Sequence, residues 1–268
     1  MNLSFLKLRV ADCPWILFDA SAMVRNNDDG TRKPDWATVA RAICGRSRGA
    51  SAEGVILADS ARDGQRLDAW SRTGSQCSLS PTAALCAARW LFDAGRAGRD
   101  SEVLVIDSRN FGLAIGMPES PTGGSLLETL GGLRLGTSVG TGVGILVPVS
   151  IGGFDINVVL FDSPPPLSYS NRFKAARSSG ESSIEVLVVS RAELRLKRGR
   201  SDPIVAAAAA LAAAVAADVA DREVVVLTGG DRLVAQWPEH GPVFVAAAPS
   251  YCLSGEFWAE DEALSGSL

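Results

Sequence analysis

Two residues that could do chemistry occur in the same local context, at the start of an apolar segment. Ser80 and Asp202 each precede a proline, and a run of small apolar residues follows each proline. Serine and aspartate are preferred helix N-caps, and proline suits the first helical position. A helix N-terminus also attracts anionic ligands. Ser80 and Asp202 are therefore candidate catalytic residues, and for each the simpler alternative is an N-cap.

The side chains near these positions differ in the chemistry that they could carry. A carboxylate can act as a general base, which makes Asp202 the first candidate and Asp155 the second. A serine hydroxyl such as that of Ser80 is too weak a base unless a partner activates it. Cys77 lies three residues before Ser80, and its thiol could carry the chemistry from this neighbouring position.

The elements that must position these residues are two apolar helices, predicted over residues 81–94 and 203–220. Eleven alanines lie between positions 206 and 220, so the second helix has almost no polar face. A helix that is apolar on all sides is buried in a core or a membrane. The run is short and rich in alanine, and Asp218 and Asp221 close it, which favours a core.

Strand patterns flank both helices, which indicates a chain built from two similar halves. We therefore predict an α+β fold with two pseudo-symmetric halves, each a rolled, mostly antiparallel sheet around a central helix. The first half is expected over residues 1–109 and the second over 110–253, with 254–268 returning to the first. A small-molecule ligand would lie in the cleft between the halves.

Composition narrows the class of protein. The 268 residues are 47% hydrophobic and carry a formal net charge of -4, so no basic footprint for nucleic acid is present. Five cysteines without a CxxC pair favour free thiols in a reducing compartment, and with a single histidine they give no zinc spacing. We expect a cytoplasmic protein without signal peptide, membrane contact, metal or cofactor, and leave a homodimer open.

Three stretches, in chain order, resemble motifs of the diaminopimelate epimerases. Arg46–Ile56 (RSRGASAEGVI) is similar to R-x-x-G-I-G-A-D-G-L. Trp70–Cys86 (WSRTGSQCSLSPTAALC) is similar, without a gap, to F-N-A-D-G-S-E-x-x-x-C-G-N-G-A-R-C. Lys197–Val215 (KRGRSDPIVAAAAALAAAV) is similar, also without a gap, to E-R-G-x-G-E-T-x-A-C-G-T-G-A-C-A-A-A-V. The resemblance implies the same two-half fold and a cofactor-independent isomerase scaffold.

The catalytic positions of that family are changed in this chain. The family uses two cysteines at facing helix N-termini, and here Ser80 and Ala206 occupy their places. An alanine cannot carry a proton, so the two-cysteine reaction is predicted to be absent. Pro81 also lacks the N–H that the family offers to a substrate carboxylate. Asp155 lies in the run that resembles the family's G-N-P-H element and replaces its imidazole.

The resemblance also points to substrate-binding positions. Arg198 is retained from the family's E-R-G element and could hold a carboxylate bidentately, although a surface charge is an equal alternative. Ser71 occupies the place of a substrate-holding asparagine. Cys13 lies in the run that resembles the early G-N-D-F element, on the substrate side.

Two functions from different classes fit these residues. The first is a diverged isomerase, lyase or cyclase that acts on a small amino-acid-like or natural-product substrate in amino acid metabolism or biosynthesis. The second is a pseudoenzyme, a binding or scaffold protein that kept the fold and lost the reaction. A concave site with a carboxylate would favour the enzyme, whereas a filled site would favour the scaffold.

One prediction follows from the sequence alone. In deuterated water the protein should not exchange the α-proton of diaminopimelate, because Ala206 cannot transfer a proton. Proton NMR of the substrate measures this directly. Exchange at the rates of an epimerase would refute the prediction, and exchange that survives Ser80→Ala and Cys77→Ala would place the catalytic groups elsewhere.

Overall fold

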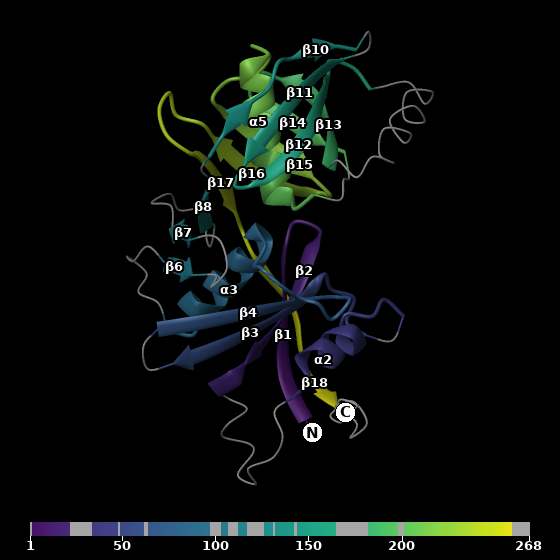
Figure 1. Ribbon diagram of the computed structural model, residues 1–268, viewed down its shortest axis with the longest axis vertical. Helices are drawn as coiled ribbons and strands as arrows, with labels where there is room; N and C mark the ends of the chain where they lie inside the picture. Colours follow the sequence, from purple (N-terminus) through teal and green to yellow (C-terminus); the bar gives the residue numbers. More distant parts are fainter. Residues whose placement is uncertain are drawn as a thin grey trace. The chain divides into compact units, whose positions relative to one another are not determined.

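The computed structural model describes residues 2–21, 34–47, 49–61, 64–96, 103–106, 112–116, 126–130, 132–141, 144–164, 182–197 and 201–258. The chain divides into two compact units (Figure 1). The first consists of Met1–Met117 with Pro249–Leu268, and the second of Pro118–Ala248.

The first unit holds a six-stranded sheet in the order β18-β1-β2-β3-β4-β5. Its elements are β1 (Asn2–Val10), β2 (Cys13–Asp19), α2 (Trp36–Ile43), β3 (Gly54–Ala61), β4 (Gly64–Ser71), β5 (Gln76–Cys77), α3 (Pro81–Asp93), β6 (Val103–Ile106), β7 (Gly112–Gly116) and β18 (Ser250–Trp258). Among the described strands of this sheet, β2 and β3 pair in parallel and the other neighbours are antiparallel. Helix α2 begins after the N-cap Asp35 and buries Val39, Ala40 and Ile43.

The second unit holds a larger sheet in the order β10-β11-β12-β13-β14-β15-β16-β17-β8, with β9 beside β11. Its elements are β8 (Leu126–Leu130), β9 (Arg134–Leu135), β10 (Val139–Gly140), β11 (Ile145–Ile151), β12 (Phe154–Phe161), β13 (Ser182–Ser190), β14 (Glu193–Leu196), α5 (Pro203–Ala216), β15 (Glu223–Thr228), β16 (Asp231–Gln236) and β17 (Val243–Ala247). The sheet is mostly antiparallel, with parallel pairs β12–β13 and β14–β15.

The two units repeat one chain path. In the first, the antiparallel pair β1–β2 is followed by parallel β3, antiparallel β4 and helix α3. In the second, the antiparallel pair β11–β12 is followed by parallel β13, antiparallel β14 and helix α5. The predicted fold class, two pseudo-symmetric α+β halves with mostly antiparallel sheets, is confirmed.

Helix α5 forms the core of the second unit. Every residue from Ile204 to Ala214 is at most 5% exposed, which matches the absence of a polar face. The helix contacts strands all around the sheet, from β9 and β11 to β17, so the sheet is rolled around it (Figure 1). In the described part of the chain, no helix combines the length and apolar character needed to span a membrane.

Both central helices end in the same hydrogen-bonded motif. In α5 the N–H groups of Asp218 and Val219 donate to the carbonyls of Val215 and Ala214 at 3.0 and 2.9 Å, which is a Schellman motif. Asp218 has a φ of 55°. The prediction that this helix extends to residue 220 was therefore wrong, because the left-handed residue 218 ends it at Ala216.

The boundaries between the units also differ from the expected positions. The division falls at residues 117/118 and 248/249, compared with the expected 109/110 and 253/254. Strand β7 pairs with β6, so the chain stays in the first unit beyond residue 110. Strand β18 already pairs with β1 from Ser250, so the return begins before residue 254.

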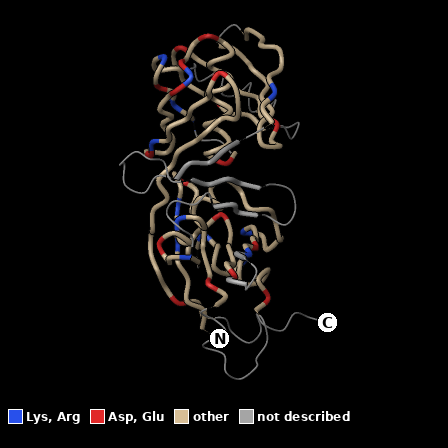
Figure 2. Tube along the Cα trace, turned by 90° about the vertical axis from the view of Figure 1, so that its left-hand side faces the viewer, with Lys and Arg blue, Asp and Glu red and all other residues tan. Residues whose placement is uncertain are grey.

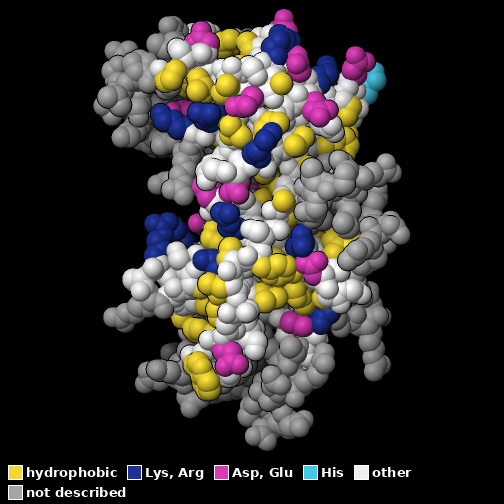
Figure 3. Space-filling model, turned by 180° about the vertical axis from the view of Figure 1, so that it is seen from behind, with side chains coloured by type: hydrophobic (Ala, Val, Ile, Leu, Met, Phe, Trp, Pro, Cys, Tyr) yellow, Lys and Arg dark blue, Asp and Glu magenta, His cyan; other side chains and the backbone are white. Residues whose placement is uncertain are grey.

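Charged residues of both signs are distributed along the described parts of both units (Figure 2). On the face shown in Figure 3, basic and acidic side chains lie among apolar ones. This mixture agrees with the modest formal net charge of -4.

The end of α3 gives a test of backbone conformation. Gly95 has a φ of 65°, and a Cβ added there would meet no heavy atom within 4 Å. Gly95→Ala should therefore cost about 1–2 kcal/mol of unfolding free energy through backbone strain alone. Gly95→Asn should cost less, because asparagine tolerates the left-handed region. Chemical denaturation measures both, and equal stability of all three proteins would contradict this account.

Candidate functional site

The start of α3 brings together four polar side chains of the first unit. Ser80 is the N-cap, and its Oγ accepts from the N–H of Ala83 at 3.3 Å. The Oγ1 of Thr82, fully buried, accepts from Trp15 Nε1 at 3.2 Å and donates to Cys13 Sγ at 3.4 Å. The hydroxyls of Ser80 and Thr82 are 3.1 Å apart.

The partners in these hydrogen bonds limit what Ser80 can do. Ser80 and Thr82 share a hydrogen bond in which either hydroxyl can be the donor, and Thr82 also bonds to Cys13. Among the described residues, the hydroxyl of Ser80 bonds to Thr82 and to the N–H of Ala83, and to neither a carboxylate nor an imidazole. A serine that acts as a nucleophile or base needs such a partner to take its proton. Within these hydrogen bonds Ser80 acts as a helix cap, and Thr82 positions it.

The other candidates of the first unit lie near the sheet edge. Ser71 ends β4, and its Oγ lies 2.7 Å from Thr73 Oγ1. Cys77 is a partly buried residue of β5, where it pairs with Ala69. Of the remaining thiols, burial raises the pKa of Cys44 to about 12, which keeps it protonated and inert.

The start of α5 confirms the predicted cap. Asp202 is the N-cap, and its Oδ1 accepts from the N–H of Ile204 at 2.9 Å. The helix begins at Pro203, and the N–H of Ala206 donates to the carbonyl of Asp202 at 2.9 Å. The amide at the family's second cysteine position is therefore used inside the helix. Arg198, the predicted carboxylate ligand, lies outside the described residues.

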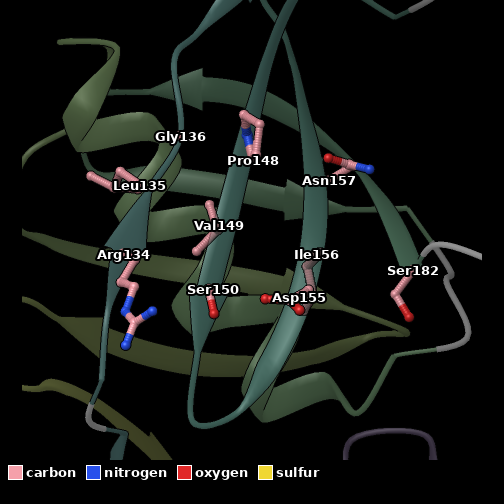
Figure 4. A pocket seen from close by; sticks show the side chains of 10 residues that line it. All are labelled: Arg134, Leu135, Gly136, Pro148, Val149, Ser150, Asp155, Ile156, Asn157 and Ser182. Carbon is pink, nitrogen blue, oxygen red and sulfur yellow. The ribbon is translucent and has the colours of Figure 1, made fainter.

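Asp155 is the predicted site residue that lines a cavity. It lies near the start of β12 and pairs with Ser150 of β11, which in turn pairs with Arg134 of β9. Directly paired residues of neighbouring strands point to the same face. Arg134, Ser150 and Asp155 thus form a row across three strands on the face turned away from α5 (Figure 4). The cavity has a volume of about 640 Å³, and Asn157 and Ser182 line its other side.

This row offers complementary groups to a small polar molecule. Arg134 and Asp155 are exposed, and among the described residues neither forms an ion pair or a side-chain hydrogen bond. A guanidinium binds a carboxylate with two parallel hydrogen bonds, whereas a carboxylate accepts from an ammonium or takes a proton. The described residues contain no group of three or more His, Cys, Asp or Glu side chains suited to a metal ion.

The sequence did not point to Arg134, Ser150 or Thr82. Arg134 belongs to a two-residue strand in a glycine-rich stretch without periodicity. Its pairing with Ser150 therefore could not be predicted from the sequence. Thr82 carried a usable signal, because a polar residue inside an apolar helix is buried only when it is hydrogen-bonded.

No protein-family model and no curated protein matches this sequence. Solved structures match over almost the whole chain. A phenazine biosynthesis protein of the PhzF family from Enterococcus faecalis has a TM-score of 0.65 at 13% identity, covering 97% of this chain and 100% of that one. A predicted epimerase from Pseudomonas aeruginosa has a TM-score of 0.58 at 16% identity, covering 96% and 100%. A hydroxyproline epimerase from Agrobacterium vitis, solved with bound trans-4-hydroxy-L-proline, has a TM-score of 0.55 at 11% identity, covering 96% and 91%.

These likenesses define the class of fold. The chain has the fold that PhzF-family proteins share with epimerases and racemases of small molecules. The resemblance to the diaminopimelate epimerases predicted this fold, which is confirmed. At these identities the likeness establishes the fold and leaves the reaction to be argued from the side chains.

Two substitutions of Asp202 distinguish a role as helix cap from a role in catalysis. Asp202→Ala should lower the free energy of unfolding by about 1 kcal/mol, because the N–H of Ile204 loses its acceptor. Asp202→Asn keeps an acceptor oxygen and should retain the stability. Denaturant titration of both variants checks this. If Asp202→Asn abolished a measured activity while stability held, Asp202 would be catalytic and the cap role incidental.

Proposed function

We propose that this protein binds a small amino-acid-like molecule, and that Asp155 provides the acid–base chemistry of an isomerase-type reaction. The observation that carries the proposal is the row Arg134–Ser150–Asp155 in one cavity. Of the hydroxyl and carboxylate groups predicted from the sequence as catalytic candidates, those of Ser80 and Asp202 serve as helix caps. Asp155 is the one with a free carboxylate in a cavity.

The row suits a reaction with one acid–base group. Arg134 would bind the carboxylate of the substrate and fix its position relative to Asp155. The Asp155 carboxylate would take a proton from an activated carbon of the substrate and return it to another carbon, or to the opposite face of the same carbon. Because the substrate regains the proton that it loses, the product is an isomer and no co-reactant is needed. Ser150, between the two charges, would donate to the substrate oxygen.

The reaction that uses two facing thiols does not fit these residues. Ala206 has no proton to give, and its amide is used by the helix. The hydroxyl of Ser80 is committed to Thr82 and to the N–H of Ala83. We therefore propose that the chain has lost the two-cysteine mechanism and that any turnover depends on Asp155.

A second function, binding without turnover, is favoured by one specific observation. Both helix starts, where the resembling family places its catalytic groups, are occupied by caps and prolines. A protein with this arrangement could keep the cavity at Asp155 as a binding site only. In that case Arg134 would hold the ligand and Asp155 would bind its ammonium group as a fixed ion pair.

Solvent exchange on a panel of amino acids tests the proposed reaction. In deuterated water the protein should introduce deuterium into at least one member, detected by mass spectrometry. Asp155→Asn should lower the rate by about 10²–10⁴-fold, the usual contribution of a general acid or base. Arg134→Met should raise KM more than it lowers kcat, because the guanidinium binds the substrate in both ground and transition states.

Asp162→Asn is the matched control, since it removes a carboxylate just beyond the end of β12 and outside this cavity. Its exchange rate should equal that of the unaltered protein. Full exchange in Asp155→Asn would overturn the proposed role of Asp155. Binding of a panel member that depends on Arg134 and Asp155, without any exchange, would establish the non-catalytic alternative.

A further inference from the structure

A second row of residues lies beside the charged row at Asp155, in the same cavity. Pro148 of β11 pairs with Asn157 of β12 in the strand register. The carbonyl of Pro148 also accepts from the N–H of Gly136 at 2.9 Å, which places Gly136 opposite it. Each of these three residues is two positions from a member of the charged row, so both rows point to the same face of the sheet. Figure 4 shows the second row, Gly136–Pro148–Asn157, next to the first.

Gly136 and Pro148 form an apolar wall of the cavity. A Cβ added at Gly136 would lie 2.9 Å from Pro148 Cβ and 3.0 Å from its Cγ. The proline ring therefore occupies the space in which a side chain of residue 136 would stand, and a larger residue fits there only if the ring moves. Such a wall suits the aliphatic carbons of a ligand.

Asn157 gives the second row its polar group. It is half-buried and lies two residues beyond Asp155 on β12. Its side-chain amide has an oxygen that accepts hydrogen bonds and an NH₂ group that donates them, so it can bond to a ligand while it also bonds to the protein. The complementary group on a ligand is a carboxamide, because it accepts and donates at the same time.

The two rows differ in charge. Among the described residues that line the cavity, Arg134 and Asp155 are the charged ones, and both belong to the first row. Their opposite charges match the carboxylate and the ammonium of an amino acid. A charged side chain on that amino acid would reach the second row without a counter-charge and would lose part of its hydration. The cavity therefore favours a ligand with an uncharged side chain.

The spacing of the rows limits the length of that side chain. Two residues along a strand correspond to about 7 Å. One hydrogen bond covers ~3 Å of this distance, so a side chain that starts beside Ser150 must extend about 4–7 Å to bond to Asn157. The side chain of glutamine is long enough, whereas the side chains of alanine and serine are too short.

We propose that Asn157 is a specificity-determining residue that selects an amino acid with a carboxamide side chain, such as glutamine. The carboxylate and ammonium of this ligand lie at the row Arg134–Ser150–Asp155. Its aliphatic carbons contact Pro148 and Gly136, and its carboxamide bonds to Asn157. The assignment rests on the function proposed above, because the first row must hold the amino-acid group.

Three ligands with one side-chain skeleton test the selection by isothermal titration calorimetry. L-glutamine should bind at least about fivefold more tightly than L-homoleucine, which has the same branched skeleton without the amide. L-glutamate should bind no more tightly than homoleucine, because its charge has no partner in the second row. Asn157→Leu should remove the preference for glutamine over homoleucine or reverse it, since the leucine side chain is apolar and similar in shape to asparagine.

Asn2→Leu is the matched control, because it makes the same substitution on β1 of the first unit. It should keep the preference for glutamine. A preference that persisted in folded Asn157→Leu would overturn the assignment. Gly136→Ala provides a second test if Asn157→Leu does not fold. Its methyl group displaces the ring of Pro148 and should weaken glutamine more than L-alanine, so an equal effect on both ligands would also overturn the assignment.

L-alanine separates this inference from the proposed function, because it carries the amino-acid group but does not reach the second row. Alanine binding that Asp155→Asn weakens, together with equal affinities for glutamine and homoleucine, would overturn the selection by Asn157 and leave the first row intact. If the unaltered protein bound none of these ligands, both the selection and the proposed function would be wrong.

Discussion

The burial of an alanine-rich helix without a polar face inside a rolled sheet is the constraint on which the second unit depends. Alanine side chains are short, so the strands can pack close to the helix, and no polar face is left for water or ligand. Such a helix must satisfy the polar groups of its ends locally. Asp202 does so at the start, and the bonds to the carbonyls of Val215 and Ala214 do so at the end. The same solution recurs in α3 with Ser80 and Gly95.

That constraint decides where chemistry can occur in this chain. In α5 the N–H groups of Ile204 and Ala206 and the side chain of Asp202 form hydrogen bonds within the helix start. These groups therefore stabilise the helix and do not bind a ligand. The polar face left for a ligand in the second unit is the outer side of the sheet, where register sets charged residues in rows. The cavity at Asp155 lies on that side. The groups that we propose for binding and acid–base chemistry thus lie on strands and not at the helix starts.

The parts of this structure that depend on local signals were predictable. The Ser-Pro and Asp-Pro pairs located the starts of both central helices, and the alternating strand patterns predicted the two-half fold. The end of α5 was not predictable. Glycine at position 95 indicates a left-handed conformation, whereas aspartate at position 218 gives no such indication. Arg134 was missed because its place beside Ser150 depends on pairing between distant segments. Asp155 was predicted as a carboxylate in a run that resembles a known motif, whereas the cavity that it lines depends on the strand register.

The path of the chain through the first unit has a consequence for its synthesis. Strand β18 comes from the last described residues of the chain and pairs along most of β1, which comes from the first. A ribosome therefore releases the N-terminal strands long before their neighbour exists, and one side of β1 stays unpaired during that time. The second unit is continuous in sequence and is complete earlier. The middle of the chain can therefore fold before the last strand of the first unit has been synthesised.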